Sequence, residues 1–333
     1  MRILLWHVHG AWTEAFVQGR HQYLLPWTPE GGQWGLGRGG RDWPNSAREV
    51  DPEQLRNLDV DAVVLQRPEE VAEVERLLGR RAGKDMPAVF VEHNTPRGDI
   101  AKCLHPLSDQ SDIPIVHVTH FNDVYWDSGR AATTVIEHGI KDPGDLYSGV
   151  LPNLGVVIND PVRRWRITGT DLLPRFADAG RIDVFGMGGA GLPEQLGLDD
   201  AAMHVHGDLP GGSLYNELAK RRVYLHPFRW TSLGLALLEA MHLGMPVVAL
   251  AATEAIRAVP PEAGAISTNI DELCEAAEKL IADPAEARAR GRVAREVALT
   301  RYNLADFLRR WDEVLTDIRP TSVTGRAPGE GRP

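Results

Sequence analysis

The sequence predicts an α/β protein built from two doubly wound domains. Short apolar runs, typical of buried parallel strands, alternate along the chain with segments of helical periodicity. These runs fall into two sets, and residues 141–154 between them contain Pro and Gly. The length of 333 residues is sufficient for two such domains. We therefore expect a mainly parallel sheet in each half of the chain.

The predicted strands alternate with predicted helices in both halves, which is the pattern of consecutive βαβ units. The strands expected in the first half are Ile3–Val8, Ala62–Leu65, Ala88–Val91 and Ile115–Val118. Those expected in the second half are Arg181–Phe185, Met203–Val205, Val223–Leu225 and Val247–Leu250. The helices expected between them include Glu69–Arg81, Gly169–Ala179, Ser213–Lys220 and Leu233–His242. Three amphipathic helices are then expected at Asp271–Ala282, Pro284–Thr300 and Asn303–Asp317.

The boundary between the two Rossmann-like domains is expected within residues 141–154. An N-terminal domain would cover residues 1–148 and a C-terminal domain residues 149–301. Residues 319–333 are rich in Pro, Gly, Thr and Arg, a composition that predicts disorder.

The composition indicates a soluble globular protein and argues against several functions. Hydrophobic residues make up 43% of the chain and charged residues 25%, both ordinary values. The net charge of −10 argues against a general nucleic-acid binder and weakens attachment to an acidic membrane. The two cysteines, Cys103 and Cys274, imply neither a metal cluster nor a disulfide framework. We expect a cytoplasmic protein, since no signal peptide and no apolar stretch of about 20 residues is recognisable.

The stretch HPFRWTSLGLALLEAMHLGMPVVAL, residues 226–250, is the most informative part of the chain. Thr231 and Ser232 are natural N-cap residues for the helix expected from Leu233 to His242. Gly244 stands where a C-terminal cap is expected, and a buried strand follows. A helix N-terminus beside strand ends is an anion site. Glu239 is the one carboxylate on this otherwise apolar helix.

Within this stretch, LGLALLEAMHLGMPVV at 233–248 resembles the donor-site motif of a known enzyme family. VIEHGI at 135–140, RIDVFGMG at 181–188 and the segment 204–227 fit the same pattern. The chain is similar to retaining glycosyltransferases of the two-domain GT-B type, family-4-like, also called glycosyltransferase group 1. The resemblance covers most of residues 130–317, whereas residues 1–130 match only by architecture and a few positions. It implies that the last helix, about 302–318, packs back on the N-terminal domain.

The resemblance implies transfer of a sugar from a nucleoside-diphosphate sugar, UDP- or GDP-linked, to an acceptor in the cleft. Retention of configuration, no metal and no other cofactor are implied as well. Glu239 would hold the ribose hydroxyls, and a carboxylate suits that diol because its hydrogen bonds are charge-assisted. The helix start would face the donor diphosphate, with Gly10 approaching from the N-terminal domain and His93 acting near the reacting sugar. The residues at this helix start are Thr231, Ser232, Leu233 and Gly234.

Two positions depart from the family pattern. Thr231 stands where the family has a glutamate that contacts the donor sugar, which leaves the sugar open. Thr168 stands where the family has a diphosphate-binding lysine. Arg163, Arg164 and Arg166 lie nearby and carry the planar guanidinium that suits phosphate oxygens. Which of these three arginines binds the diphosphate is left open by the sequence.

Several alternatives remain open at this stage. Residues 26–48, with Trp27, Trp34 and Trp43, form either a platform for a sugar ring or a packed lid. Instead of a glycosyltransferase, the chain could be a catalytically weak nucleotide-sugar-binding or partner subunit, or a sugar-nucleotide epimerase. The acceptor is a small molecule or a glycan, with a soluble one slightly favoured over a lipid. The nucleotide base, the sugar, the acceptor and the question of a homodimer stay undetermined.

Overall fold

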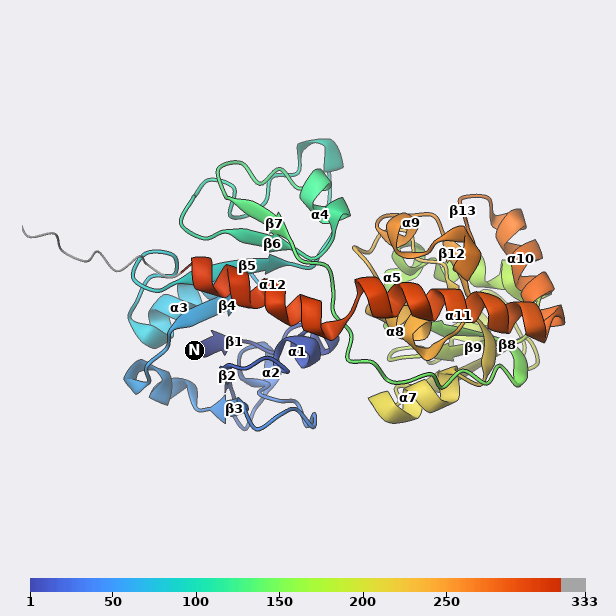
Figure 1. Cartoon of the computed structure of the whole chain (residues 1–333), viewed down its shortest axis with the longest axis horizontal. Coiled ribbons are helices and arrows are strands. Elements are labelled where there is room, and N and C mark those ends of the chain that lie inside the picture. Colours follow the sequence, from blue (N-terminus) through green and yellow to red (C-terminus); the bar gives the residue numbers. More distant parts are fainter. Residues whose placement is uncertain (319–333) are drawn as a thin grey trace, which may run out of the picture.

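The computed structural model describes residues 1–318, which form two lobes joined by two crossings of the chain (Figure 1). Each lobe is a parallel sheet with helices packed on both faces. The α/β fold with two doubly wound domains is therefore confirmed. The tail for which the composition predicts disorder, 319–333, lies outside the described residues.

The N-terminal sheet has seven strands in the order β3-β2-β1-β4-β5-β6-β7. Its strands are β1 (Arg2–Leu5), β2 (Gln22–Pro26), β3 (Ala47–Val50), β4 (Ala62–Leu65), β5 (Ala88–Glu92), β6 (Ile115–His117) and β7 (Thr133–Val135). Its helices are α1 (Gly10–Phe16), α2 (Gly32–Gly35), α3 (Glu70–Leu78) and α4 (His120–Tyr125), with 3₁₀ turns at Pro52–Asn57 and Ile100–Lys102. Every neighbouring pair is parallel, so all the strands end at the same edge of the sheet.

The C-terminal sheet has six strands in the order β10-β9-β8-β11-β12-β13, again all parallel. Its strands are β8 (Leu151–Val157), β9 (Ile182–Phe185), β10 (Met203–Gly207), β11 (Arg221–His226), β12 (Val247–Leu250) and β13 (Gly264–Ser267). Its helices are α5 (Pro161–Thr168), α6 (Leu192–Leu196), α7 (Gly211–Leu218), α8 (Leu235–Leu243), α9 (Ala255–Ala258), α10 (Ile270–Ala282) and α11 (Pro284–Arg301). The 3₁₀ segments are Thr170–Phe176 and Pro261–Ala263.

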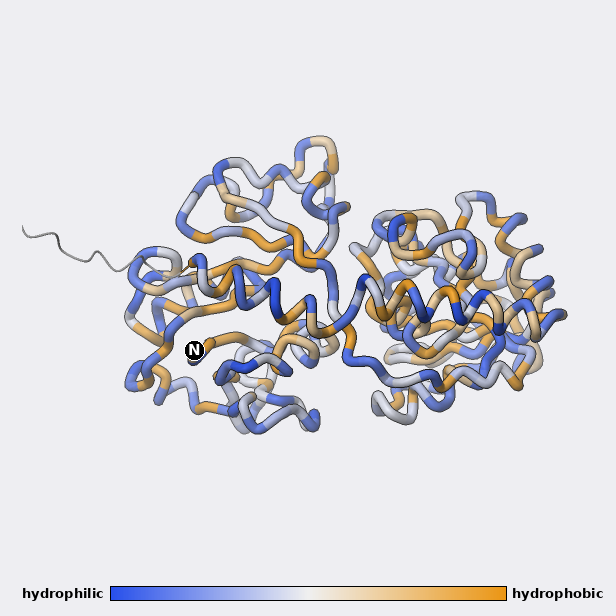
Figure 2. The backbone as a smooth tube through the Cα atoms, in the orientation of Figure 1, coloured by the Kyte–Doolittle hydropathy of each residue, from blue (hydrophilic) through white to orange (hydrophobic). Residues whose placement is uncertain are grey.

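Both faces of each sheet are buried, which explains why the strands read as continuous apolar runs. Along β1, Ile3 and Leu5 belong to one core cluster while Leu4 and Trp6 belong to the cluster on the opposite face. The same alternation places Val247 and Val248 of β12 in different clusters. The hydrophobic segments accordingly run through the interior of both lobes (Figure 2). This two-sided burial is characteristic of doubly wound sheets.

The last helix, α12 (Leu304–Asp317), leaves the C-terminal lobe and packs on the N-terminal one (Figure 1). Its buried stripe consists of Phe307, Trp311 and Leu315, spaced by one helical turn. The ring of Trp311 lies 5.6 Å from that of Trp12 and 5.2 Å from that of Phe16. The N-terminal core is therefore completed by the C-terminal end of the described chain.

Some elements differ from the sequence prediction, each for a physical reason. The segment predicted as a helix at Gly169–Ala179 is a 3₁₀ segment, Thr170–Phe176, that contains Pro174. Proline lacks the amide that an α-helix requires at this position. Helix α8 begins at Leu235 with Gly234 as its N-cap residue, so the prediction of Thr231 or Ser232 as the cap is wrong. Strands β2, β3, β7, β8 and β13 were not among the predicted strands.

No helix within residues 1–318 is both long and apolar enough to cross a membrane.

Candidate active site

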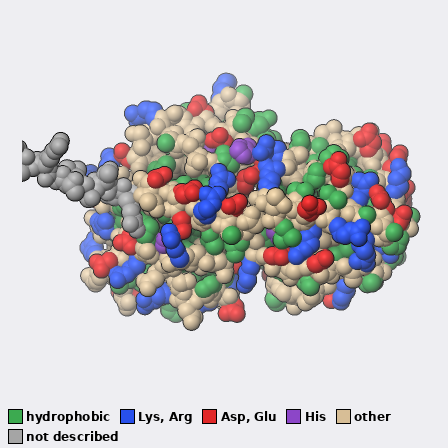
Figure 3. Space-filling view, viewed as in Figure 1, with side chains coloured by type: hydrophobic (Ala, Val, Ile, Leu, Met, Phe, Trp, Pro, Cys, Tyr) green, Lys and Arg blue, Asp and Glu red, His purple; other side chains and the backbone are tan. Residues whose placement is uncertain are grey.

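A cavity of about 880 Å³ lies between the two domains. Its walls are loops that follow the carboxyl ends of strands in both sheets, which is where open parallel sheets bind ligands. The N-terminal wall contains residues 9–11, 14–15 and 39–43, and the interdomain crossing adds 139–143. The C-terminal wall contains Arg164, the loop 208–212, Tyr215, Glu239 and the start of α8. In the space-filling view the outline narrows between the two lobes (Figure 3).

The carboxylate of Glu239 lines this cavity from the second turn of α8. Its Oε1 accepts a hydrogen bond of 3.2 Å from the hydroxyl of Tyr215 on α7. Burial raises the pKa of Glu239 to about 7, against the opposing effect of the Tyr215 hydrogen bond. A carboxyl group in this setting gains from hydroxyl donors, because they stabilise its charged form. Glu239 is therefore suited to accept hydrogen bonds from a diol.

The N-terminus of α8 opens onto the cavity through Gly234, Leu235 and Ala236. The first amides of a helix have no intrahelical acceptor, so they are available to an anion. Gly234 is required here by packing, because a Cβ atom at this position would lie 2.7 Å from Cε1 of His226. The helix start is thus held against β11 with its backbone exposed to the cavity.

Of the three arginines that follow β8, Arg164 lines the cavity. Arg163 pairs with Asp160 at 2.5 Å, and Arg166 pairs with Asp171 at 3.1 Å. Burial lowers the pKa of Arg164, and the charge of Arg163 lowers it further. A partly buried cation that lines the same cavity as the start of α8 is suited to an anionic ligand. The next residue, Trp165, has a φ of 29°, a strained value for a bulky side chain.

The segment that carries Thr231 contacts the N-terminal domain. The hydroxyl of Ser232 lies 2.9 Å from that of Thr119, and the indole of Trp230 donates to the carbonyl of Pro96 at 2.9 Å. Leu233 is buried in the core of the C-terminal domain. Within residues 229–236, those that line the cavity are Gly234, Leu235 and Ala236. Thr231, Ser232 and Leu233 thus lie in or beside the domain contact.

Three histidines, His9, His93 and His138, lie close together at the N-terminal wall. The rings of His9 and His93 lie 4.0 Å apart, and His9 lines the cavity. Burial lowers the pKa of His9 to about 4 and that of His138 to about 3. The pKa of His93 lies well below its usual value for the same reason. All three imidazoles are therefore neutral near pH 7. His93 packs against the ring of His9 and does not itself line the cavity.

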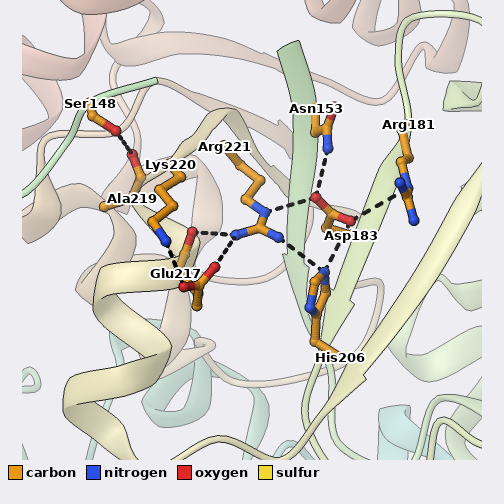
Figure 4. A network of polar contacts seen from close by, with 9 residues as sticks. All are labelled: Ser148, Asn153, Arg181, Asp183, His206, Glu217, Ala219, Lys220 and Arg221. Carbon is orange, nitrogen blue, oxygen red and sulfur yellow. Dashed lines mark hydrogen bonds and ion pairs between the residues drawn. The ribbon is translucent and has the colours of Figure 1, made fainter. Parts of the chain in front are cut away.

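A polar network centred on Asp183 and Arg221, both buried, reaches the C-terminal end of α7 (Figure 4). Asp183 of β9 accepts hydrogen bonds from Asn153, His206 and Arg221, at 2.8, 3.1 and 2.7 Å. Burial alone would raise the pKa of Asp183, but these donors hold it below its usual value. Arg221 also donates to the backbone oxygen of Glu217 at 2.6 Å, which ties down the end of α7. The network therefore positions the helix that carries Tyr215.

The tryptophan-rich segment between β2 and β3 contributes residues 39–43 to the cavity wall. Trp43 is buried, and Trp34 packs edge-on against Trp6 with 6.0 Å between ring centroids. Trp27 is 44% exposed. The two interpretations of this segment are a platform for a sugar ring and a packed lid. The burial of Trp43 and the packing of Trp34 favour the packed arrangement. Within residues 1–318, no group of three or more His, Cys, Asp or Glu side chains is arranged to hold a metal ion.

Residues 171–283 match the family model described as Glycosyl transferases group 1. This match lies within the C-terminal lobe, from the 3₁₀ segment after α5 to the end of α10. None of the curated proteins matches its sequence. The match includes the motif at 233–248, so the resemblance of this segment to glycosyltransferase group 1 is confirmed.

Solved structures of glycosyltransferases share the two-domain GT-B fold of this chain over nearly its whole length. Sucrose-phosphate synthase from Thermosynechococcus elongatus is 16% identical, with a TM-score of 0.71 over 96% of this chain and 99% of the other. HepE of Anabaena, solved in complex with UDP, is 14% identical, with a TM-score of 0.71 over 95% and 100%. A glycosyltransferase from Rickettsia africae is 11% identical, with a TM-score of 0.65 over 95% and 97%. At these identities the likeness concerns the fold.

The structure brings four of the predicted site residues to one cavity: Gly10, Arg164, Gly234 and Glu239. The sequence reasoning did not identify Tyr215, Lys141 and Arg41, which also line it. For Tyr215 the sequence did offer a clue, because SLYNEL at 213–218 lies in the segment 204–227 that fits the family pattern. No sequence pattern pointed to Arg41, because residues 26–48 show neither helical nor strand periodicity. Only the fold brings that segment to the cavity between the domains.

Proposed function

We propose that the protein transfers a sugar from a nucleoside-diphosphate sugar to an acceptor bound in the cavity between its domains. The observation that carries this proposal is the grouping of Glu239, the start of α8 and Arg164 on one wall. Glu239 would accept hydrogen bonds from a ribose diol, and the amides at the start of α8 would bind a diphosphate. Arg164 would stabilise the negative charge that a diphosphate leaving group develops. The match to glycosyltransferase group 1 and the shared GT-B fold support the same activity.

Uridine diphosphate is the nucleotide part we favour, with a guanosine diphosphate sugar as the other candidate. HepE has been solved with UDP and with UDP-glucose, and a pneumococcal O-GlcNAc transferase of the same fold with UDP and GlcNAc. In this chain the loop 208–212 and α7, braced by the Asp183 network, would hold the base. The acceptor, a small molecule or a glycan, would enter from the side of the N-terminal wall.

The chemistry we propose is retaining and independent of metal. As the sugar–phosphate bond breaks, negative charge develops on the diphosphate, which the α8 amides and the Arg164 guanidinium would stabilise. Preorganised donors in a cleft shielded from water stabilise such charge more than water does. The leaving phosphate itself would take the acceptor proton. Closure of the two domains would limit hydrolysis of the donor.

His93 is our candidate for the catalytic side chain of the N-terminal domain, acting together with His9. Since His9 faces the cavity and His93 packs against its ring at 4.0 Å, His93 would orient His9 toward the sugar or the acceptor. Both imidazoles are held neutral by burial, so each can accept one hydrogen bond and donate another. A neutral pair of this kind suits recognition of hydroxyl groups.

The proposal is tested by incubating the protein with UDP-, GDP- and dTDP-sugars and measuring release of the free diphosphate. We expect release from at least one donor, with a transferred sugar detected on an added acceptor by mass spectrometry. Glu239→Ala should weaken binding of that nucleotide by at least tenfold, because it removes both hydrogen bonds to the ribose. Absence of nucleotide binding across the panel would contradict the proposal.

One observation favours a second candidate, a subunit that binds the donor with little turnover. The segment around Thr231, where the family glutamate would contact the sugar, is engaged in contacts with Pro96 and Thr119. A domain pair held in this way would bind nucleotide without completing the sugar site. Tight nucleotide binding with no turnover for any donor and acceptor in the panel would decide for this candidate. A cytoplasmic location and a homodimer stay predictions.

A further inference from the structure

The N-terminal wall of the cavity carries a basic side chain, Arg41, to which the proposed function gives no role. Arg41 follows Gly39 and Gly40 in the segment between β2 and β3, and all three line the cavity with Asp42 and Trp43. Its side chain is 47% exposed. A cation on the wall opposite the start of α8 is well placed for a ligand that spans the cleft.

The backbone that presents Arg41 is fixed by its neighbours. The Nε of Arg38 donates to the carbonyl of Arg41 at 3.2 Å, and its Nη2 donates to the carbonyl of Trp43. The amide of Arg38 donates in turn to Glu49 at 2.7 Å, and Trp43 is buried in the N-terminal core. The Arg38 side chain therefore holds the backbone of Arg41 and Trp43 in place, while the side chain of Arg41 lies at the cavity.

The guanidinium of Arg41 lies over Gly10. A Cβ atom at position 10 would lie 2.8 Å from Nη2 of Arg41, so the absence of a side chain there makes room for the cation. The carboxylate of Glu14 is 3.6 Å from Nη1, a long ion pair between half-exposed groups. Pairs of this kind contribute little and exchange partners readily. A phosphate could therefore replace Glu14 at Arg41 without a large loss.

The opposite wall is close enough for Arg41 to act on it. Burial raises the pKa of Glu239 and of Tyr215, two groups of the C-terminal domain that line the same cavity, and the positive charge of Arg41 opposes that rise in both. That domain offers only Arg164 among its described arginines at the cavity. The Thr168 hydroxyl is buried and bonded to Thr170 at 2.9 Å, so the position of the family's lysine supplies no cation.

We infer that Arg41 binds the donor diphosphate from the N-terminal domain and supplies the cation that is missing at Thr168. The inference rests on the proposed function and adds a ligand contact from the opposite domain. The planar guanidinium of Arg41 suits two phosphate oxygens at once, as does that of Arg164. A diphosphate held by both arginines links the two domains, so donor binding favours the closed cleft. Glu14 holds Arg41 in place until the diphosphate arrives.

The test compares Arg41→Gln, Arg41→Lys and the control Arg48→Gln by calorimetry with UDP, UMP, uridine and the matching guanosine series. Arg48 is an exposed arginine on β3 outside the cavity, so its variant removes the same charge from the same domain. Arg41→Gln should weaken diphosphate binding roughly tenfold and leave the nucleoside within about twofold. Arg41→Lys should restore part of the loss, and Arg48→Gln should bind as the wild type does.

Equal losses for diphosphate and nucleoside would overturn the inference, because they would mean a ribose contact or a disturbed fold. An unchanged diphosphate affinity in Arg41→Gln would overturn it as well. If the wild type binds nucleotide and Glu239→Ala weakens it while Arg41→Gln does not, only this inference fails. If the wild type binds none of the nucleotides, the proposed function itself fails.

Discussion

The hydroxyl groups of Thr119 and Ser232 lie 2.9 Å apart and form a buried hydrogen bond between the two domains. Thr119 also accepts from the amide of Asn122 and so caps α4. Nearby, the carboxylate of Glu254 accepts from the amide of Phe121 at 2.8 Å. The relative position of the domains is therefore fixed by polar contacts of limited number, which single substitutions can test.

Ser232→Ala should lower the free energy of unfolding by about 1 kcal/mol, the typical contribution of a hydrogen bond. Thr119→Val should cost more, since it also removes the cap of α4, an effect of about 1 kcal/mol on its own. Urea denaturation of both variants and of the double variant measures the coupling between them. A coupling near zero would show that the two hydroxyls do not bond in solution.

The pH dependence of nucleotide binding should report on Glu239. Burial raises the pKa of its carboxyl group to about 7, and a ribose diol binds the ionised form best. Affinity should therefore increase as the pH rises from 6 to 8, by roughly threefold or more. Glu239→Gln should bind more weakly and lose this dependence. Calorimetry at three pH values makes the comparison, and a pH dependence retained in the variant would assign the titration to another group.

Stability toward acid should depend on His138. Burial lowers its pKa to about 3 in the folded chain, whereas an unfolded histidine titrates near 6.5. Between these values unfolding takes up a proton, so stability rises with pH by about 1.4 kcal/mol per unit from this group. That stability is complete above pH 6.5 and is lost as the pH falls toward 3.

His138→Asn should therefore reduce the slope of unfolding free energy against pH between 6.5 and 5. The measurement is urea denaturation at several pH values for the wild type and the variant. The raised pKa of Glu239 acts in the opposite sense, since the stability it adds below its ordinary value of 4.5 is lost as the pH rises through 7. It is common to both proteins, so the difference isolates His138. Identical slopes would contradict the assignment.

The C-terminal helix should be essential to the N-terminal domain. Trp311 is 1% exposed and packs against Trp12 and Phe16, so Trp311→Ala should cost about 3–5 kcal/mol. Glu313→Ala, on the exposed face of the same helix, should change stability by less than about 0.5 kcal/mol. Thermal unfolding followed by tryptophan fluorescence compares the two. Similar effects of both substitutions would mean that α12 does not pack there in solution.

Local patterns predicted the elements whose cause is local. The apolar runs at Ala62–Leu65 and Val247–Leu250 coincide with β4 and β12, because strands buried on both faces leave a continuous signal. The start of α8 was mispredicted because the best capping hydroxyl, that of Ser232, bonds to Thr119 of the other domain instead. Tertiary contacts of that kind are not encoded in the neighbouring residues.

The candidate site likewise contains residues that a local motif identifies and residues that only the tertiary fold brings together. Glu239 and Gly234 belong to one motif, so the sequence identified both. The N-terminal wall depends on the packing of residues 26–48. This segment is rich in glycine and contains three tryptophans, and it shows neither helical nor strand periodicity from which its structure could be predicted. His9 and His93 are far apart in the chain and meet only because β1 and β5 end at the same edge of the sheet.

Gly10→Ala tests whether this glycine serves the ligand through Arg41. The new Cβ atom would meet the end of the flexible Arg41 side chain, so the guanidinium should shift while the fold is kept. Alanine is also a better helix former than glycine at the start of α1, so stability should not fall. We expect weaker diphosphate binding in the wild-type background and little further loss in Arg41→Gln. A full loss in both backgrounds would mean that the diphosphate approaches the Gly10 backbone directly, since the displaced group would then be the ligand.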